Sequence, residues 1–213
     1  MAVLAGAHTD HAVHMSGLPE WVRIGAALLL AAVAVLHAHH GAHMPGQRRW
    51  WHLGHGVMAA GMAAMYLLPR LRYEGLHQGG LVLFALLPAG TVAAAAGLRS
   101  REGALNPIWT MSAVDYLAMV YMLTDPALRP AWLGYAFAAY FACAVLGWIA
   151  RAFDRLPVFA RALPAGAGRA SGPALLSAPP LGASEGAPAR SRVSVALTLA
   201  VMAAAMAGML AAM

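Results

Sequence analysis

The sequence predicts an all-α integral membrane protein, a bundle of about six transmembrane helices. Hydrophobic residues make up 61% of the chain and charged residues only 10%, a balance that is foreign to water-soluble domains. Six apolar segments approach the roughly 20 residues that a hydrocarbon core of about 30 Å requires. Turn residues and arginines separate these segments, as in "HMPGQRR" and "TDPALRP", which supports separate helices.

The segments divide the chain into four parts. Residues 1–20 contain His8, His11 and His14 and are expected to form an extracytoplasmic histidine-rich arm, an unstructured terminus being the alternative. Residues 21–153 form a five-helix transmembrane body, with spans over 21–40, 51–68, 77–98, 108–124 and 131–152. Residues 154–192, rich in Pro, Gly, Ala and Ser, predict a disordered cytoplasmic linker. Residues 193–213 form the final transmembrane helix.

The arginines predict the orientation, because cytoplasmic loops of membrane proteins carry an excess of basic residues. Loops after the first, third and fifth spans hold ten of the fourteen arginines, and the other side holds four. This bias places the linker in the cytoplasm and both termini outside. All basic residues are arginine and alanine dominates, as in proteins of GC-rich bacteria, so the bacterial cytoplasmic (inner) membrane is the expected location. The arginines sit at span ends without aromatic interleaving, so no nucleic-acid partner is expected despite the net charge of +6.

Methionines form stripes on three of the expected helices. A helix turns about 100° per residue, which places each stripe within an arc of about 80° or less. The stripe residues on the second, fourth and sixth spans are, in order, His55, Met58, Met62 and Met65; Met111, Asp115, Met119 and Met122; and Met202, Met206, Met209 and Met213.

These stripes favour a soft metal ion, because thioethers bind Cu(I) well and bind Mg²⁺ or Ca²⁺ poorly. We therefore expect a protein that binds or conducts a soft transition metal ion, Cu(I) above others, through helices lined by Met and His. The alternative is packing, since methionine fills irregular gaps between helices and the neighbouring Ala and Gly permit close approach. Such a protein would be a structural or partner-binding membrane protein without metal.

Histidines cluster where the first span ends and the second begins. Two helices joined by a short loop are antiparallel neighbours, so this cluster is expected to gather at the cytoplasmic boundary. Imidazole accepts copper, zinc, nickel and iron, which makes the cluster the less selective end of a metal path. Solvated histidines near the headgroups are the alternative. The cluster consists of His37, His40, His43, His52 and His55.

Asp115 stands alone as an acidic residue within a span. A carboxylate near mid-bilayer costs at least about 2.5 kcal/mol and usually faces the bundle interior with a partner. Its expected roles are a neutral acid hydrogen-bonded to Tyr116, Thr110 or a histidine, an ion ligand, or a proton relay.

The chain carries no P-loop, dinucleotide fingerprint, HExxH or GxSxG motif, so no enzymatic activity is expected. A haem-binding electron-transfer subunit is a further alternative, because histidines on facing helices ligate haem. A copper ion is thus the cofactor that the sequence favours, and haem is the second candidate. The lipid bilayer is the expected environment, and the sequence leaves open a homo-oligomer or another membrane partner.

The stretches "HLGHGVMAAGMAAMYLLP", "SAVDYLAMVYML" and "VMAAAMAGMLAAM" together resemble an actinobacterial family of Met/His-rich polytopic membrane proteins known only as a domain of unknown function. The resemblance covers most of the chain outside the linker and the amino terminus, and it implies a fold and a membrane location without a mechanism. The layout is also similar, more distantly, to copper transporters of the eukaryotic plasma membrane, whose MxxxM helix matches Met202 to Met206. That likeness is an analogy of layout only.

Overall fold

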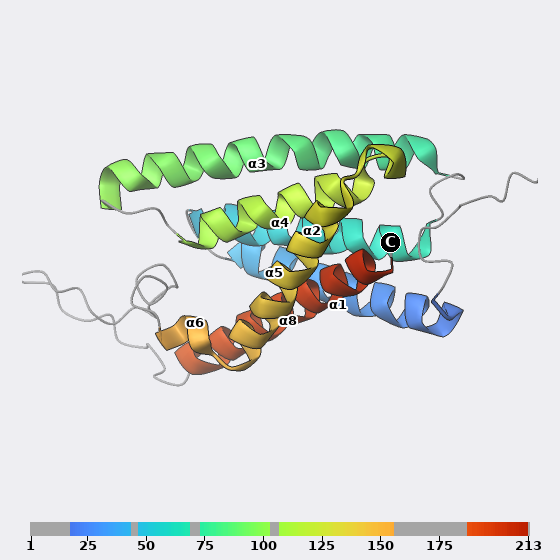
Figure 1. Cartoon of the computed structure of the whole chain (residues 1–213). Coiled ribbons are helices and arrows are strands. Elements are labelled where there is room, and N and C mark those ends of the chain that lie inside the picture. The colour runs from blue at the N-terminus through green and yellow to red at the C-terminus, as the bar shows by residue number, and fades with distance from the viewer. Residues whose placement is uncertain (1–17, 44–46, 69–72, 103–106, 156–186, 213) are drawn as a thin grey trace, which may run out of the picture.

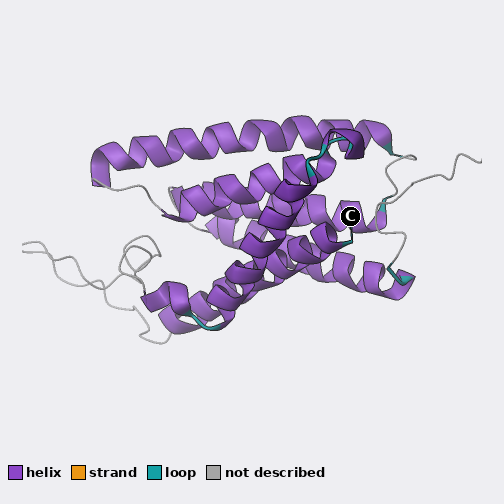
Figure 2. Cartoon of the chain, viewed as in Figure 1, coloured by secondary structure: helices purple, strands orange, loops and turns teal. Residues whose placement is uncertain are grey.

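The structure is a computed structural model that describes residues 18–43, 47–68, 73–102, 107–155 and 187–212. Within these ranges the regular secondary structure is all helical, joined by short loops and with no strand (Figures 1 and 2). The long helices are α1 (Glu20–His43), α2 (Gln47–Leu67), α3 (Glu74–Glu102), α4 (Pro107–Leu123), α5 (Ala131–Ile149) and α8 (Ala187–Ala211). A 3-10 turn, η2 (Pro126–Leu128), precedes α5, and the short α6 (Ala152–Arg155) follows it. The predicted all-α fold is confirmed.

Among the described residues, four helices are long and apolar enough to cross a membrane. They are α1, the part of α3 over Glu74–Ala94, α5, and the part of α8 over Val193–Ala211. The apolar stretch of α4, Ile108–Leu123, is shorter than a full span. Helix α2 has 21 residues but opens with Gln47, Arg48 and Arg49, which lower its mean hydropathy. The chain is therefore a membrane protein, with four of the six expected spans meeting the criteria of length and composition.

The long helices associate as three antiparallel pairs. Helix α1 packs mainly on α2, α3 on α4, and α5 on α8, and weaker contacts join α2 to α4 and α8. Figure 1 shows α3 along one edge of the bundle and α5 crossing the other helices obliquely. Each pair contributes one of the three methionine-bearing helices α2, α4 and α8. The methionine faces can therefore meet only through the association of all three pairs.

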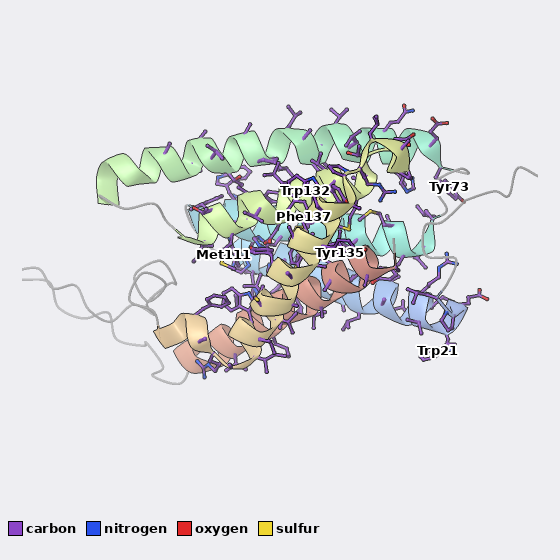
Figure 3. All side chains as sticks on the ribbon, viewed as in Figure 1. Trp21, Tyr73, Met111, Trp132, Tyr135 and Phe137 are labelled. Atoms are coloured by element: carbon purple, nitrogen blue, oxygen red, sulfur yellow. The ribbon has the colours of Figure 1, made fainter. Side chains whose placement is uncertain are left out.

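Large apolar side chains cover the outside of the bundle. Trp21 on α1 and Tyr135 on α5 are 76% and 78% exposed, respectively. Figure 3 shows Trp21 projecting from the outer end of α1, whereas Met111 lies among the ribbons of the bundle. Such an apolar exterior suits lipid, where hydrocarbon replaces water as the solvent.

Several helix boundaries differ from the sequence-based expectation. Helix α1 continues through His43, past residue 40, because polar residues can extend a helix beyond the apolar core. Helix α8 begins at Ala187, so residues 187–192 are helical and not part of a disordered linker, and α6 likewise includes residues 154 and 155. The remainder of the linker, residues 156–186, and most of the histidine-rich arm, residues 1–17, lie outside the described residues.

Candidate functional site

The three methionine faces converge on one interior. Seven methionines of these faces are at most 2% exposed and belong to a single core cluster, and Met65 is partly buried against it. A face that pointed to lipid would leave its thioethers exposed. The convergence that a shared interior requires is therefore present, with Met58 and Met62 from α2, Met119 and Met122 from α4, and Met202, Met206 and Met209 from α8.

Close approach between the pairs depends on small residues and on hydrogen bonds. A Cβ added at Gly61 would lie 2.8 Å from Cζ of Phe84 and 3.2 Å from Cε of Met119, so glycine permits the contact of α2 with α3 and α4. The Tyr66 hydroxyl donates to the carbonyl of Ala205 on α8 at 3.2 Å. Arg23 Nε donates to the carbonyl of Tyr66 at 3.1 Å. These bonds join α1, α2 and α8 at the end of the bundle where α2 finishes.

A cavity of about 30 Å³ lies among α2, α4, α5 and α8. A water needs about 10–15 Å³ measured in this way, so the space suits an ion with a water or two. Four methionines line it together with one histidine and one carboxylate, which gives both soft and polar atoms to the same cavity. These residues are Met58, Met111, Met202, Met206, His55 and Asp115.

His55 is held in a ligand-ready orientation. Its Nδ1 lies 3.0 Å from the carbonyl oxygen of Trp51, and because a carbonyl only accepts, Nδ1 carries the proton. The neutral ring then has its lone pair on Nε2, the arrangement that backbone carbonyls impose on metal-ligating histidines. Trp51 is fixed in turn, since its Nε1 donates to Ser112 Oγ at 3.1 Å. Ser112 on α4 thereby positions the α2 turn that carries His55.

The structure gathers most of the predicted histidine cluster. Nδ1 of His37 lies 3.0 Å from Nδ1 of His52, and the rings of His37 and His55 are 5.6 Å apart. The His40 ring lies 5.2 Å from that of His52. His43 is exposed and contacts the His39 ring at 4.3 Å. Four of the five predicted histidines are therefore neighbours, and the fifth joins them through His39.

These histidines adjoin one another without converging on one point. Among the described residues, no three His, Cys, Asp or Glu side chains lie close enough to hold a metal ion together. An ion bound in the described interior would therefore take part of its coordination from the methionine thioethers. This makes the cavity, where both residue types meet, the candidate centre.

Asp115 is partly buried and accepts a hydrogen bond from the Tyr140 hydroxyl at 3.2 Å. The sequence led us to expect a hydrogen bond from Tyr116, Thr110 or a histidine. The structure instead shows a hydrogen bond from Tyr140 on α5. No periodicity within one helix indicates Tyr140, because the two residues meet only through the packing of separate pairs. Both residues line the cavity, which places an acidic group beside the thioethers.

One further histidine, His39, was missing from the predicted cluster, whereas Met111, a member of the predicted stripe on α4, lines the cavity with Asp115. His39 lies between His37 and His40 in the sequence, and its spacing of four residues to His43 is the signal that could have included it. It is exposed and contacts both His40 and His43.

The family comparison matches residues 47–213, all of the chain from α2 onward. The chain belongs to the family described as Domain of unknown function (DUF5134). The expected membership in a family of unknown function is thus confirmed. The DUF5134 match includes every residue that lines the cavity, whereas α1 and its histidines precede it. The match also runs through residues 156–186, a segment outside the resemblance expected from the sequence. Comparisons with curated proteins and with solved structures find no match.

Proposed function

We propose that this protein binds a soft metal ion, Cu(I), inside the membrane at the cavity between its three helix pairs. One observation carries the proposal: methionines of α2, α4 and α8 line one ion-sized cavity together with His55, whose Nδ1 is engaged by the Trp51 carbonyl and whose Nε2 keeps its lone pair. Thioether and imidazole together suit Cu(I) better than any other common metal ion. The buried or partly buried methionines beyond the cavity would let the ion pass further along the bundle; they are Met62, Met65, Met119, Met122 and Met209.

Packing accounts for buried methionines but not for the polar lining of this cavity. Asp115 and His55 are each hydrogen-bonded, to the Tyr140 hydroxyl and to the Trp51 carbonyl, so neither needs an ion as its partner. Truly empty cavities in proteins are, however, apolar. Here Asp115 and His55 face the same space as Met202 and Met206. This mixture supports an occupied site over a packing defect.

The cavity volume also favours an ion over haem. Cofactor pockets have volumes of about 300 Å³ or more, whereas this cavity is about 30 Å³. A porphyrin would need to separate α2 from α8, which the Tyr66 bond to Ala205 holds together. A bound ion needs no such rearrangement.

We further place the junction of α1 and α2 at the cytoplasmic face of a bacterial inner membrane, with both termini outside. The excess of arginines on that side supports this orientation.

Anaerobic titration of the full-length protein with Cu(I), against a chromophoric chelator, tests the proposal. We expect stoichiometric binding that the chelator reverses, and loss of that binding in Met58→Leu combined with Met202→Leu. The matched control, Met62→Leu combined with Met122→Leu, changes methionines that are equally buried but lie outside the cavity lining, and it should keep the site. A Soret band in the purified protein would favour haem instead, and absence of both signals would leave packing.

A further inference from the structure

Six histidines form an unbroken series of ring contacts from the exposed end of α1 to the cavity. The ring centroids of His43 and His39 are 4.3 Å apart, and those of His39 and His40 are 6.1 Å apart. The series then crosses to α2, where the ring centroids of His40 and His52 are 5.2 Å apart. It returns to α1 with 5.2 Å between the centroids of His52 and His37. It ends on α2 with 5.6 Å between the centroids of His37 and His55. We call these six residues the histidine chain.

Burial increases along the histidine chain. His39 and His43 are exposed and His40 is partly buried. His37, His52 and His55 are 1%, 3% and 2% exposed, and His55 lines the cavity. Imidazoles that served only to meet the headgroups would remain at the surface, so the inner half of the chain needs another explanation.

His37 supplies a second, independent observation. Its Nε2 is buried, and no group in the described part of the chain hydrogen-bonds it. Leaving a buried polar nitrogen unsatisfied costs about 1–3 kcal/mol, and such groups are rare unless they serve a function. His37 is also the member that contacts both His52 and His55, so the unpartnered nitrogen lies at the middle of the series.

The surface end of the chain resembles a capture site. His39 and His43 are four residues apart on α1, the spacing that places two histidines of a helix on one metal ion. His43 Nδ1 donates to the carbonyl of His39 at 2.8 Å, so its neutral ring presents the lone pair of Nε2. The pair thus offers ligand nitrogens to water at the end of the bundle.

We propose that the histidine chain is the route by which the metal ion exchanges between water and the intramembrane cavity, with His39 and His43 as the surface capture site. This inference rests on the proposed function. Each step replaces one imidazole nitrogen by the next on an ion that remains Cu(I), so no electron or proton acceptor is required. Because the route affects the rate of exchange and not its end point, the equilibrium affinity is set by the cavity ligands alone.

Stopped-flow loading of the full-length protein in lipid nanodiscs tests the route. Trp51 lies against His55, with ring centroids 4.1 Å apart, and also contacts the rings of His52 and His37, so quenching of tryptophan fluorescence reports arrival of Cu(I) at the inner end of the histidine chain and the adjoining cavity. We expect His39→Leu combined with His43→Leu, and separately His37→Leu, to load about tenfold or more slowly and to reach the wild-type affinity. The exposed pair is included because the buried His37→Leu variant alone could fail by misfolding.

His77→Leu is the matched control. His77 on α3 is buried, and its Nδ1 donates a hydrogen bond to the carbonyl of Tyr73, four residues earlier, at 3.1 Å. His43 and His55 make the same bond within their own helices, but His77 lies outside the histidine chain. It should load at the wild-type rate. Wild-type loading rates in both chain variants would overturn the route while leaving the cavity site intact. A wild-type protein that binds no Cu(I) at all would refute the proposed function and the route with it.

Discussion

Met206 and Met209 provide the sharpest separation of metal binding from packing. Both lie on α8, both are at most 1% exposed, and both belong to the same core cluster. Only Met206 lines the cavity. Replacing either by leucine nearly conserves volume and should cost less than about 1.5 kcal/mol of folding free energy. The two variants should therefore be equally stable and differ in Cu(I) affinity alone.

The size of the difference follows from the cavity lining. Four methionines and one histidine line the cavity, and an assumed nanomolar dissociation constant corresponds to about 12 kcal/mol of binding free energy. Shared evenly among five donors, each contributes about 2.5 kcal/mol, so loss of one raises the dissociation constant roughly 70-fold. We expect this increase for Met206→Leu and no more than about a twofold change for Met209→Leu.

Chelator competition measures the affinity, and unfolding in a graded series of sodium dodecyl sulfate measures the stability. Equal weakening of Cu(I) binding in both variants would refute the assignment of the cavity as the site. Unchanged affinity in both would show that the methionine face contributes packing only.

Two further variants examine the contacts that shape the cavity. Gly61→Ala brings a methyl group within 2.8 Å of Phe84, so an overpacking cost of about 1–3 kcal/mol should exceed the gain of up to about 1 kcal/mol in helix propensity. Gly79→Ala, with nothing within 4 Å of the added methyl group, should not destabilise the protein. Detergent unfolding that finds Gly79→Ala less stable than Gly61→Ala would contradict this packing. Tyr140→Phe removes the hydrogen bond to Asp115 and should lower the free energy of unfolding by about 1–3 kcal/mol. An unchanged unfolding midpoint would show that this hydrogen bond contributes nothing to stability.

Helix periodicity predicted which residues share a helix face. The stripes on α2, α4 and α8 each became a buried face, because residues three or four apart stay on one side of any helix regardless of its partners. The proximity of His37, His40, His52 and His55 followed from the short connection between α1 and α2. Both inferences depend only on local geometry.

Contacts between separate helix pairs were beyond such reasoning. Asp115 meets Tyr140 across α4 and α5, and Ser112 fixes Trp51 across α4 and α2. Nothing in the spacing of one helix specifies which residue of a distant helix lies opposite. The cavity itself, formed by residues of four helices, has no counterpart in any single stretch of sequence.

The sequence by itself therefore determined the solvent, the helical class and the composition of each helix face, since hydropathy and a period of 3.6 residues act within one segment. Only the tertiary structure decided that three methionine faces share one interior, that His55 is the histidine at the cavity, and that His39 connects His43 to the inner imidazoles. These outcomes depend on the rotation and crossing of whole helices. Close packing among many side chains sets those rotations, and no local pattern encodes them.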